Sequence, residues 1–353
     1  MICWLRWLSE SSLTVPEAFL TLSELERNGI LAKHSAESGK SVRVLEKDVW
    51  VCWALDVLFT MPGAYPMAFK GGTSLSKVFE VIARFSEDID VTIDYRSLDD
   101  SIDPFADSTT NNRRQKLTTH LRDLVNDHVA TVVAPHFRAR LSDELGLDGD
   151  EVYLDPAEPE AVWVRYPSAL DDRDEYLADV VKLEFGGRNA IKPSESHTIV
   201  PYLADASSDL TFPSATVSVL AAERTFWEKA TLIHAELGRS EFRPGVDRIS
   251  RHWYDLDRLA SATIGSRALA DRDLFADVVR VKSVFYRAKH ADYDLCTTGG
   301  LRLVPVDEVA THYLHNDYNE MVRSSMFNGT PTDFGDILNR LDALAARINS
   351  KAF

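Results

Sequence analysis

The stretch that decides the fold is FKGGTSLSKVF, residues 69–79, where two glycines stand between an apolar segment and a predicted helix. Glycines allow a tight turn and let backbone N–H groups approach a ligand closely. A helix that begins just after the turn adds its partial positive charge at the same place. The stretch therefore predicts a phosphate site. A plain turn with a Ser or Thr helix cap would show the same pattern.

Three side chains that follow the glycines suit a phosphate ligand. Thr73 and Ser74 carry hydroxyls that can donate to phosphate oxygens, and Lys77 can offset phosphate charge. The stretch is not a Walker A loop, because the GxxxxGK[ST] spacing is absent.

The segment RFSEDIDVTID, residues 84–94, predicts a half-buried strand, because apolar and polar residues alternate strictly along it. The apolar side carries Ile89, Val91 and Ile93, and the opposite side carries Asp88, Asp90, Thr92 and Asp94. The turn at residues 71–72 thus comes shortly before a strand with an acidic face.

Asp88 and Asp90 are two residues apart on this strand and project to the same side. Like charges at that spacing repel unless a cation neutralises them. Mg²⁺ does so with oxygen ligands and usually arrives with substrate phosphates. The pair therefore predicts a phosphoryl- or nucleotidyl-transfer site. A solvated strand face would look the same, so the hypothesis also depends on the glycine turn.

Composition limits the function classes. A chain of 353 residues is long enough for two lobes, and its net charge of -16 argues against a general nucleic-acid-coating protein while leaving room for a local basic groove. Three scattered cysteines without a CxxC pair argue against a disulfide framework or a cysteine zinc site. With neither a secretory signal nor a membrane-length apolar run, we expect a cytoplasmic protein.

The order of predicted elements indicates an α+β protein. A buried helix is predicted at residues 45–59, and the segment DVVKLEFGG, residues 179–187, predicts a strand with Lys182 and Glu184 on one face. Helical patterns dominate from Leu220 onward. We therefore expect an α/β lobe with N-terminal helices at residues 1–217 and a helical lobe at residues 218–353.

The combination of glycine turn and DxD strand resembles the polymerase β-type nucleotidyltransferase superfamily. More narrowly, it resembles the AbiEii family of nucleotidyltransferase-like toxins, which includes the MenT toxins. Four motifs in the family's order carry the resemblance: FKGGTSLSKVF with RFSEDIDV, VKLEFGGR, LAAERTFWEKATLIHAE, and SRHWYDLDRL. The first has GGTS where many relatives have a plain GS. The resemblance implies a small mixed sheet, a mostly helical second lobe and a site in the cleft between them.

The resemblance also implies roles for single residues. Asp88 and Asp90 would hold Mg²⁺ or Mn²⁺, and Lys182 would bind a phosphate or lie near the attacking group. A third carboxylate is expected, either Glu223 of the third motif, which we favour slightly, or Glu184. The residues expected to hold the nucleoside triphosphate are Lys70, Gly71, Gly72, Thr73, Ser74, Lys77 and Lys229. Lys229 could equally be a solvated helix lysine.

Basic residues outside these motifs suggest further contacts. Asp255 of the fourth motif would orient a basic residue such as Arg251, one turn earlier. A candidate RNA or triphosphate contact, with an ordinary surface loop as its alternative, comprises Arg239, Arg243, Arg248, Arg251 and His252. A weaker patch comprises Arg113, Arg114 and Lys116.

The resemblance implies transfer of a nucleoside monophosphate from an NTP to an acceptor hydroxyl, at the 3′ end of tRNA. It further implies the toxin of a type IV-like, abortive-infection toxin–antitoxin system, whose antitoxin is often a winged-helix repressor. Two alternatives stay open: a protein acceptor, which the acidic composition mildly favours, and a nucleotide-binding interaction module without turnover. The pair Asp88 and Asp90, together with Lys182, argues against the module.

Overall fold

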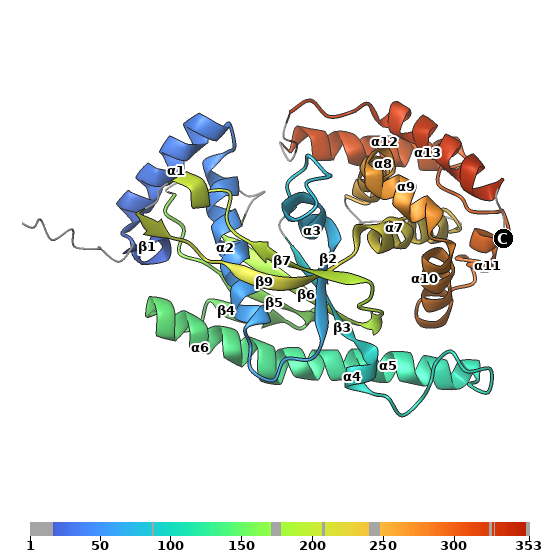
Figure 1. Ribbon diagram of the computed structural model, residues 1–353, viewed down its shortest axis with the longest axis horizontal. Coiled ribbons are helices and arrows are strands. Elements are labelled where there is room, and N and C mark those ends of the chain that lie inside the picture. The colour runs from blue at the N-terminus through green and yellow to red at the C-terminus, as the bar shows by residue number, and fades with distance from the viewer. Residues whose placement is uncertain are drawn as a thin grey trace, which may run out of the picture.

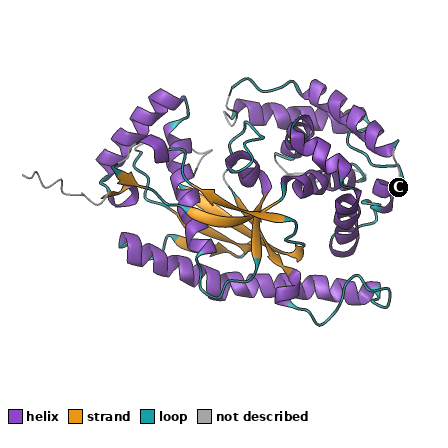
Figure 2. Cartoon of the chain, in the orientation of Figure 1, coloured by secondary structure: helices purple, strands orange, loops and turns teal. Residues whose placement is uncertain are grey.

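The computed structural model describes residues 17–86, 88–170, 178–206, 209–239, 248–324, 327 and 329–350. These residues form a seven-stranded mixed sheet with helices around it (Figure 1, Figure 2). The strand order is β4-β5-β6-β3-β2-β9-β7. The bounds are β2 Met67–Lys70, β3 Ile89–Asp94, β4 Val152–Asp155, β5 Glu158–Arg165, β6 Val180–Asn189, β7 Ser194–Ile199 and β9 Ala215–Leu220. The predicted α+β class is confirmed.

Strand pairing places the acidic strand at the centre of the sheet. β3 lies parallel to β6 and antiparallel to β2, and β2 lies parallel to β9. Ile89, Val91 and Ile93 are at most 1% exposed, as their alternation predicts. A separate two-stranded pair joins β1 Glu17–Ala18 to β8 Leu210–Thr211.

The apolar face of the sheet packs against α2 Val42–Phe59 and a long helix along the bottom of Figure 1. The long helix comprises α5 Asn111–His128, a π-helical segment Val129–Val133 and α6 Ala134–Leu145. Its buried positions recur at four-residue intervals: Leu117, Leu121, Val125, Val129, Val133, Phe137 and Leu141. The opposite face of the sheet is thereby left for polar side chains.

The helices of the C-terminal half pack around a second core (Figure 1). Trp227, Trp253 and Phe275 are fully buried there, and the rings of Trp227 and Phe275 stack with centroids 4.0 Å apart. The bounds are α7 Ala222–Glu236, α8 Arg251–Ser261, α9 Thr263–Ala270, α10 Arg272–Phe285, α11 Asp294–Thr297, α12 Glu308–Arg323 and α13 Phe334–Asn349.

The change from sheet to helices falls at residue 221, between β9 and α7. The predicted boundary between residues 217 and 218 would cut β9, so we move it by a few residues. A two-lobe organisation stays a prediction. In the N-terminal part, α1 Glu24–Ser38 and the short helical turns Phe19–Thr21 and Ala204–Ala206 complete the fold.

Two sequence-based boundaries near the acidic strand differ from the structure. The helix predicted to begin just after the glycine turn instead includes both glycines, as α3 Gly71–Lys77. The strand expected to end at Gly187 continues to Asn189. A Cβ on Gly187 would lie 2.6 Å from side-chain carbons of Leu98, in α4 Tyr95–Leu98, and of Val125, so this glycine lets helices approach the sheet.

Every helix in the described ranges falls short of the length and apolarity that crossing a membrane requires.

Candidate active site

A cavity of about 230 Å³ lies between the polar face of the sheet and the C-terminal helices. We call it the carboxylate cavity. The residues lining it that the sequence singled out are Lys70, Gly71, Gly72, Asp88, Asp90, Glu184, Lys229, Arg251 and His252. The other residues that line it are Arg84, Ser86, Thr225, Glu228, Leu232 and Lys282. The fold thus brings the first motif against helices α7, α8 and α10.

Gly71 and Gly72 bring the start of α3 into contact with the acidic strand. Gly71 has a φ of +80°, and a Cβ there would stand 1.9 Å from Oδ2 of Asp90. A Cβ on Gly72 would stand 2.5 Å from the hydroxyl of Ser86 and 2.8 Å from the guanidinium of Arg84. Only glycine therefore fits at Gly71 without moving the Asp90 carboxylate.

The hydroxyls after the glycines bond to the protein itself. Thr73 donates to the carbonyl oxygen of Asp88 over 2.5 Å, and Ser74 donates to the carbonyl oxygen of Gly71 over 2.9 Å. Both residues are at most 3% exposed and do not line the carboxylate cavity. This arrangement disagrees with the predicted direct triphosphate contact, because Thr73 bonds to the residue just before β3 and Ser74 bonds within α3.

Lys77 lies away from the carboxylate cavity. Its ammonium forms an ion pair with Asp48 of α2 and lies 3.7 Å from the ring centroid of Tyr202. It lines a separate cavity of about 190 Å³. The predicted triphosphate contact is therefore not the arrangement observed, because the end of α3 is directed toward α2.

Asp88, Asp90 and Glu184 line the same cavity, and Asp90 pairs with Glu184 in the register of β3 and β6. Glu184 also forms an ion pair with Lys182, 3.2 Å away. Among the described residues, no three His, Cys, Asp or Glu side chains form a metal cluster. Two carboxylates still suit Mg²⁺, which usually takes one or two from the protein and completes its shell with phosphate oxygens and water.

Lys182 is held outside the carboxylate cavity by its neighbours on the sheet. Its ammonium pairs with Glu158 and Glu184 and lies 5.0 Å from the ring centroid of Trp163 on β5. Burial lowers the pKa of Lys182, but the two carboxylates outweigh burial and raise it above its usual value. The predicted direct phosphate contact does not match this position.

Glu223 points away from the carboxylate cavity and pairs with Arg267 of α9. The sequence-based preference for Glu223 over Glu184 therefore runs against the geometry. On α7 the side chains that line the cavity are spaced i, i+3, i+4 and i+7: Thr225, Glu228, Lys229 and Leu232. At 3.6 residues per turn, Glu223 lies roughly 140° around the helix from Glu228.

Glu228 is a site residue that the sequence analysis missed. It is 9% exposed, and the amide nitrogen of Asn189 donates to its carboxylate over 2.7 Å. Burial raises the pKa of Glu228, but Lys282, Lys70 and Arg224 outweigh burial and lower it below its usual range. The i, i+3, i+4 pattern with Thr225 and Lys229 was the signal that could have found it.

Asp255 organises two of the cations that line the cavity. It is fully buried on α8, accepts hydrogen bonds of 2.8 and 2.7 Å from Arg84, and pairs with Lys229 at 2.8 Å. Burial raises the pKa of Asp255, but Arg84 and Lys229 outweigh burial and hold it well below its usual range. Asp255 thus orients basic residues, as predicted, but these are Arg84 and Lys229 rather than the example, Arg251.

Comparison with known protein families assigns the chain to a family. Residues 53–340 match the family model described as "Nucleotidyl transferase AbiEii toxin, Type IV TA system". The chain belongs to the AbiEii family. It is therefore a nucleotidyltransferase and the toxin of a type IV toxin–antitoxin system, which confirms the resemblance.

One solved structure similar to this AbiEii chain is MenT4, a nucleotidyltransferase toxin from Mycobacterium tuberculosis H37Rv. The two share 17% sequence identity with a TM-score of 0.43, over 93% of this chain and 98% of MenT4. No curated protein matches the chain.

Charge is unevenly distributed around the AbiEii cavity. Acidic groups come mainly from the sheet, and the helices α7, α8 and α10 add Lys229, Arg251 and Lys282. Burial lowers the pKa of Lys229 despite its pairing with Asp255, and burial with nearby Lys229 and Arg251 lowers the pKa of His252 well below its usual value. A site lined by both carboxylates and cations suits a metal-bound polyphosphate.

Proposed function

We propose that the carboxylate cavity binds a metal-bound NTP and transfers its nucleoside monophosphate to a hydroxyl at the 3′ end of tRNA. The main observation in its favour is that Asp88 and Asp90 line the same cavity as Gly71 and the cations Lys70 and Lys229. Family membership supports the reaction class, and the finer assignment of metal and acceptor is our proposal.

Asp88 and Asp90 would hold a divalent cation, Mg²⁺ or Mn²⁺. When bound, the cation would polarise the α-phosphate and favour deprotonation of the acceptor hydroxyl. Glu184 is our candidate for the third carboxylate, because it pairs in register with Asp90 and lines the same cavity. In this assignment Lys182 positions Glu184 through their ion pair.

The cations would bind the triphosphate and stabilise the leaving group. A new bond forms between the acceptor oxygen and the α-phosphorus, the α–β P–O bond breaks, and pyrophosphate leaves with its electron pair. Arg84 and Lys229 are held by Asp255, so they are preorganised to offset the charge on pyrophosphate. Gly71 and Gly72 would serve the site by letting Asp90, Ser86 and Arg84 lie close to the start of α3.

An antitoxin partner follows from the family. We propose that it is a winged-helix repressor. We also propose tRNA rather than a protein as the acceptor, because cations line the cavity in an otherwise acidic chain.

The test is incubation of the purified protein with total tRNA, Mg²⁺ and each labelled NTP in turn. We expect label in tRNA with the wild type and with Asp342→Asn, an exposed control on α13, but not with Asp90→Asn. Label in a protein band instead would move the proposal to a protein acceptor. Equal labelling by Asp90→Asn and wild type would exclude the carboxylate cavity as the site.

A further inference from the structure

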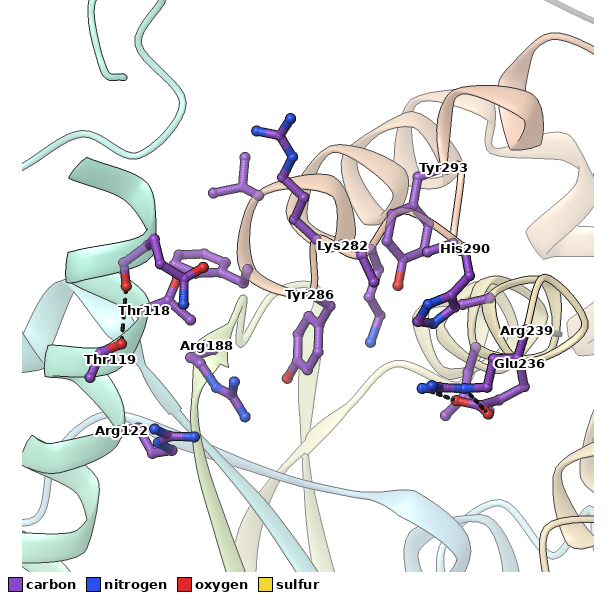
Figure 3. Close-up of a pocket in the computed structure, with 18 residues that line it drawn as sticks. Thr118, Thr119, Arg122, Arg188, Glu236, Arg239, Lys282, Tyr286, His290 and Tyr293 are labelled. Carbon is purple, nitrogen blue, oxygen red and sulfur yellow. Dashed lines mark hydrogen bonds and ion pairs between the residues drawn. The ribbon is translucent and has the colours of Figure 1, made fainter. Parts of the chain in front are cut away.

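A second cavity, of about 400 Å³, lies beside the carboxylate cavity and shares Leu232 and Lys282 with it. Side chains of α5, β6, α7, α10 and the segment after α10 line it (Figure 3). Its charged residues are Arg122, Arg188, Glu236, Arg239, Lys282 and Arg287. We call it the basic cavity.

The basic cavity holds an excess of positive charge. Its one acidic residue, Glu236, is bound by Arg239 through hydrogen bonds of 2.6 and 3.1 Å. Within the part of the chain that the structure describes, no carboxylate forms an ion pair with Arg122, Arg188 or Arg287, and Lys282 lies near the Glu228 carboxylate of the carboxylate cavity. In a chain of net charge -16, these cations form a concentrated positive site that suits a polyanion.

Tyr286 keeps two of these cations close together. The guanidinium carbon of Arg188 lies 5.1 Å from its ring centroid, and the ammonium nitrogen of Lys282 lies 4.3 Å from it. In Figure 3 the ring stands between these two side chains. The electron-rich ring faces attract cations without neutralising their charge, so both stay available to an anion.

The geometry connects the basic cavity to the proposed reaction site. Arg188 and Glu184 lie on the same face of β6 and are four residues apart. Four strand residues span about 13 Å, which is the length of about four stacked nucleotides. Lys282 lines both cavities. A chain of phosphodiesters in the basic cavity would therefore lead its end past Lys282 toward Asp90.

We propose that the basic cavity binds the phosphodiester chain of a single-stranded nucleic-acid acceptor, with its 3′-hydroxyl in the carboxylate cavity. This inference rests on the proposed function and extends it to the acceptor. The incoming NTP is a weaker candidate for the basic cavity than a nucleic-acid strand. Its triphosphate would bind the cations of the carboxylate cavity, and its base is neutral and does not require arginines. A single strand fits because only one chain end has to pass Lys282.

The experiment is an anisotropy titration of a short, 5′-labelled single-stranded RNA in the absence of NTP. We expect Arg188→Gln to weaken RNA binding about tenfold and to lower the slope of log K against log salt by about 0.7. Tyr286→Leu should also weaken binding, whereas Tyr286→Phe keeps the ring and should bind normally. Arg323→Gln is the matched control, since Arg323 is exposed on α12 and lines none of the three cavities.

A parallel titration with a fluorescent NTP analogue separates the two sites, and thermal melts verify that each variant is folded. If Arg188→Gln fails to fold, Arg287→Gln replaces it, because Arg287 is exposed. Unchanged RNA affinity in the folded variants would overturn the proposal. The proposal would also be overturned if the folded variants lost affinity for the NTP analogue but kept their affinity for RNA, or if the wild type bound no RNA.

Failure of the proposed function gives a different result. If the wild type binds RNA through Arg188 but transfers no label, the proposed transfer reaction is excluded, while the proposed RNA binding in the basic cavity is still supported.

Discussion

Asp255 is a single buried carboxylate that forms ion pairs with two cations, Arg84 and Lys229. Its carboxylate is fully buried between Arg84 and Lys229. Asp255→Asn would leave both cations buried without their counter-charge, which typically costs about 3–5 kcal/mol of folding free energy. Chemical denaturation checks this, with Asp342→Asn as the control that should stay within about 0.5 kcal/mol of wild type. A loss below about 1 kcal/mol would contradict the assigned role.

His252 makes stability depend on pH. Its pKa is depressed in the folded state, so the unfolded chain binds a proton that the folded chain does not. Stability should therefore be full above the unfolded pKa of about 6.5 and fall as the pH drops below it, by up to about 1.4 kcal/mol per pH unit. Unfolding free energies at pH 7, 6 and 5 should show a steeper fall for wild type than for His252→Gln. Parallel curves would show that His252 titrates normally.

Gly71 links backbone conformation to the carboxylate pair. In Gly71→Ala the new methyl would collide with Asp90, in addition to the strain of about 1–2 kcal/mol that a positive φ imposes on alanine. Gly146→Ala is a matched control, because Gly146 has a φ of +67° and nothing within 4 Å of an added Cβ. We expect both variants to lose stability but only Gly71→Ala to lose nucleotidyl transfer. Equal activities would mean that Asp90 can move without consequence.

At the scale of elements, α7 presents one face to the carboxylate cavity and another to α9. Glu228 lies on the first and Glu223 on the second. Glu228→Gln should destabilise the fold by about 1–3 kcal/mol, because Lys70 loses its charged partner. Glu223→Gln should change stability by less than about 0.5 kcal/mol and keep transfer activity. Activity lost in Glu223→Gln but kept in Glu228→Gln would return the third-motif role to Glu223.

Helices and strands with a clear periodic pattern of apolar residues were predictable from the sequence. The cavities and partners that individual side chains contact were less predictable. The helix at residues 45–59 and the alternation of β3 followed from local patterns, and both are present. Arg84 and Lys282 reach the carboxylate cavity from a loop and from α10, which no local period indicates. Thr73 and Lys182 match motifs, but their nearest partners are a backbone carbonyl and Glu158, which only the folded chain supplies.

For the whole molecule, ligand binding should report on the carboxylate cavity, which lies between the sheet and the C-terminal helices. Mg²⁺ with a non-hydrolysable NTP analogue should raise the free energy of unfolding of wild type by about 2.7 kcal/mol at a hundredfold excess over Kd. Chelation with EDTA, or Asp90→Asn, should abolish most of this gain. An equal gain in EDTA would mean that the nucleotide binds without the proposed cation.

The π-helical segment Val129–Val133 determines how the buried face of α5 is aligned with the buried face of α6. In a regular α-helix, four residues overshoot a full turn by about 40°, so buried positions spaced by four would wind off the sheet. The wider π turn holds more residues and winds the pattern back, which keeps Val125 and Phe137 in the same core against the sheet. Deleting one residue here would let the segment wind as a regular α-helix, because four α-helical residues turn the chain by about 400°, close to what the five residues of the wider π turn achieve now. α6 would keep nearly the same face toward the sheet, so we expect this segment to tolerate the loss of one residue.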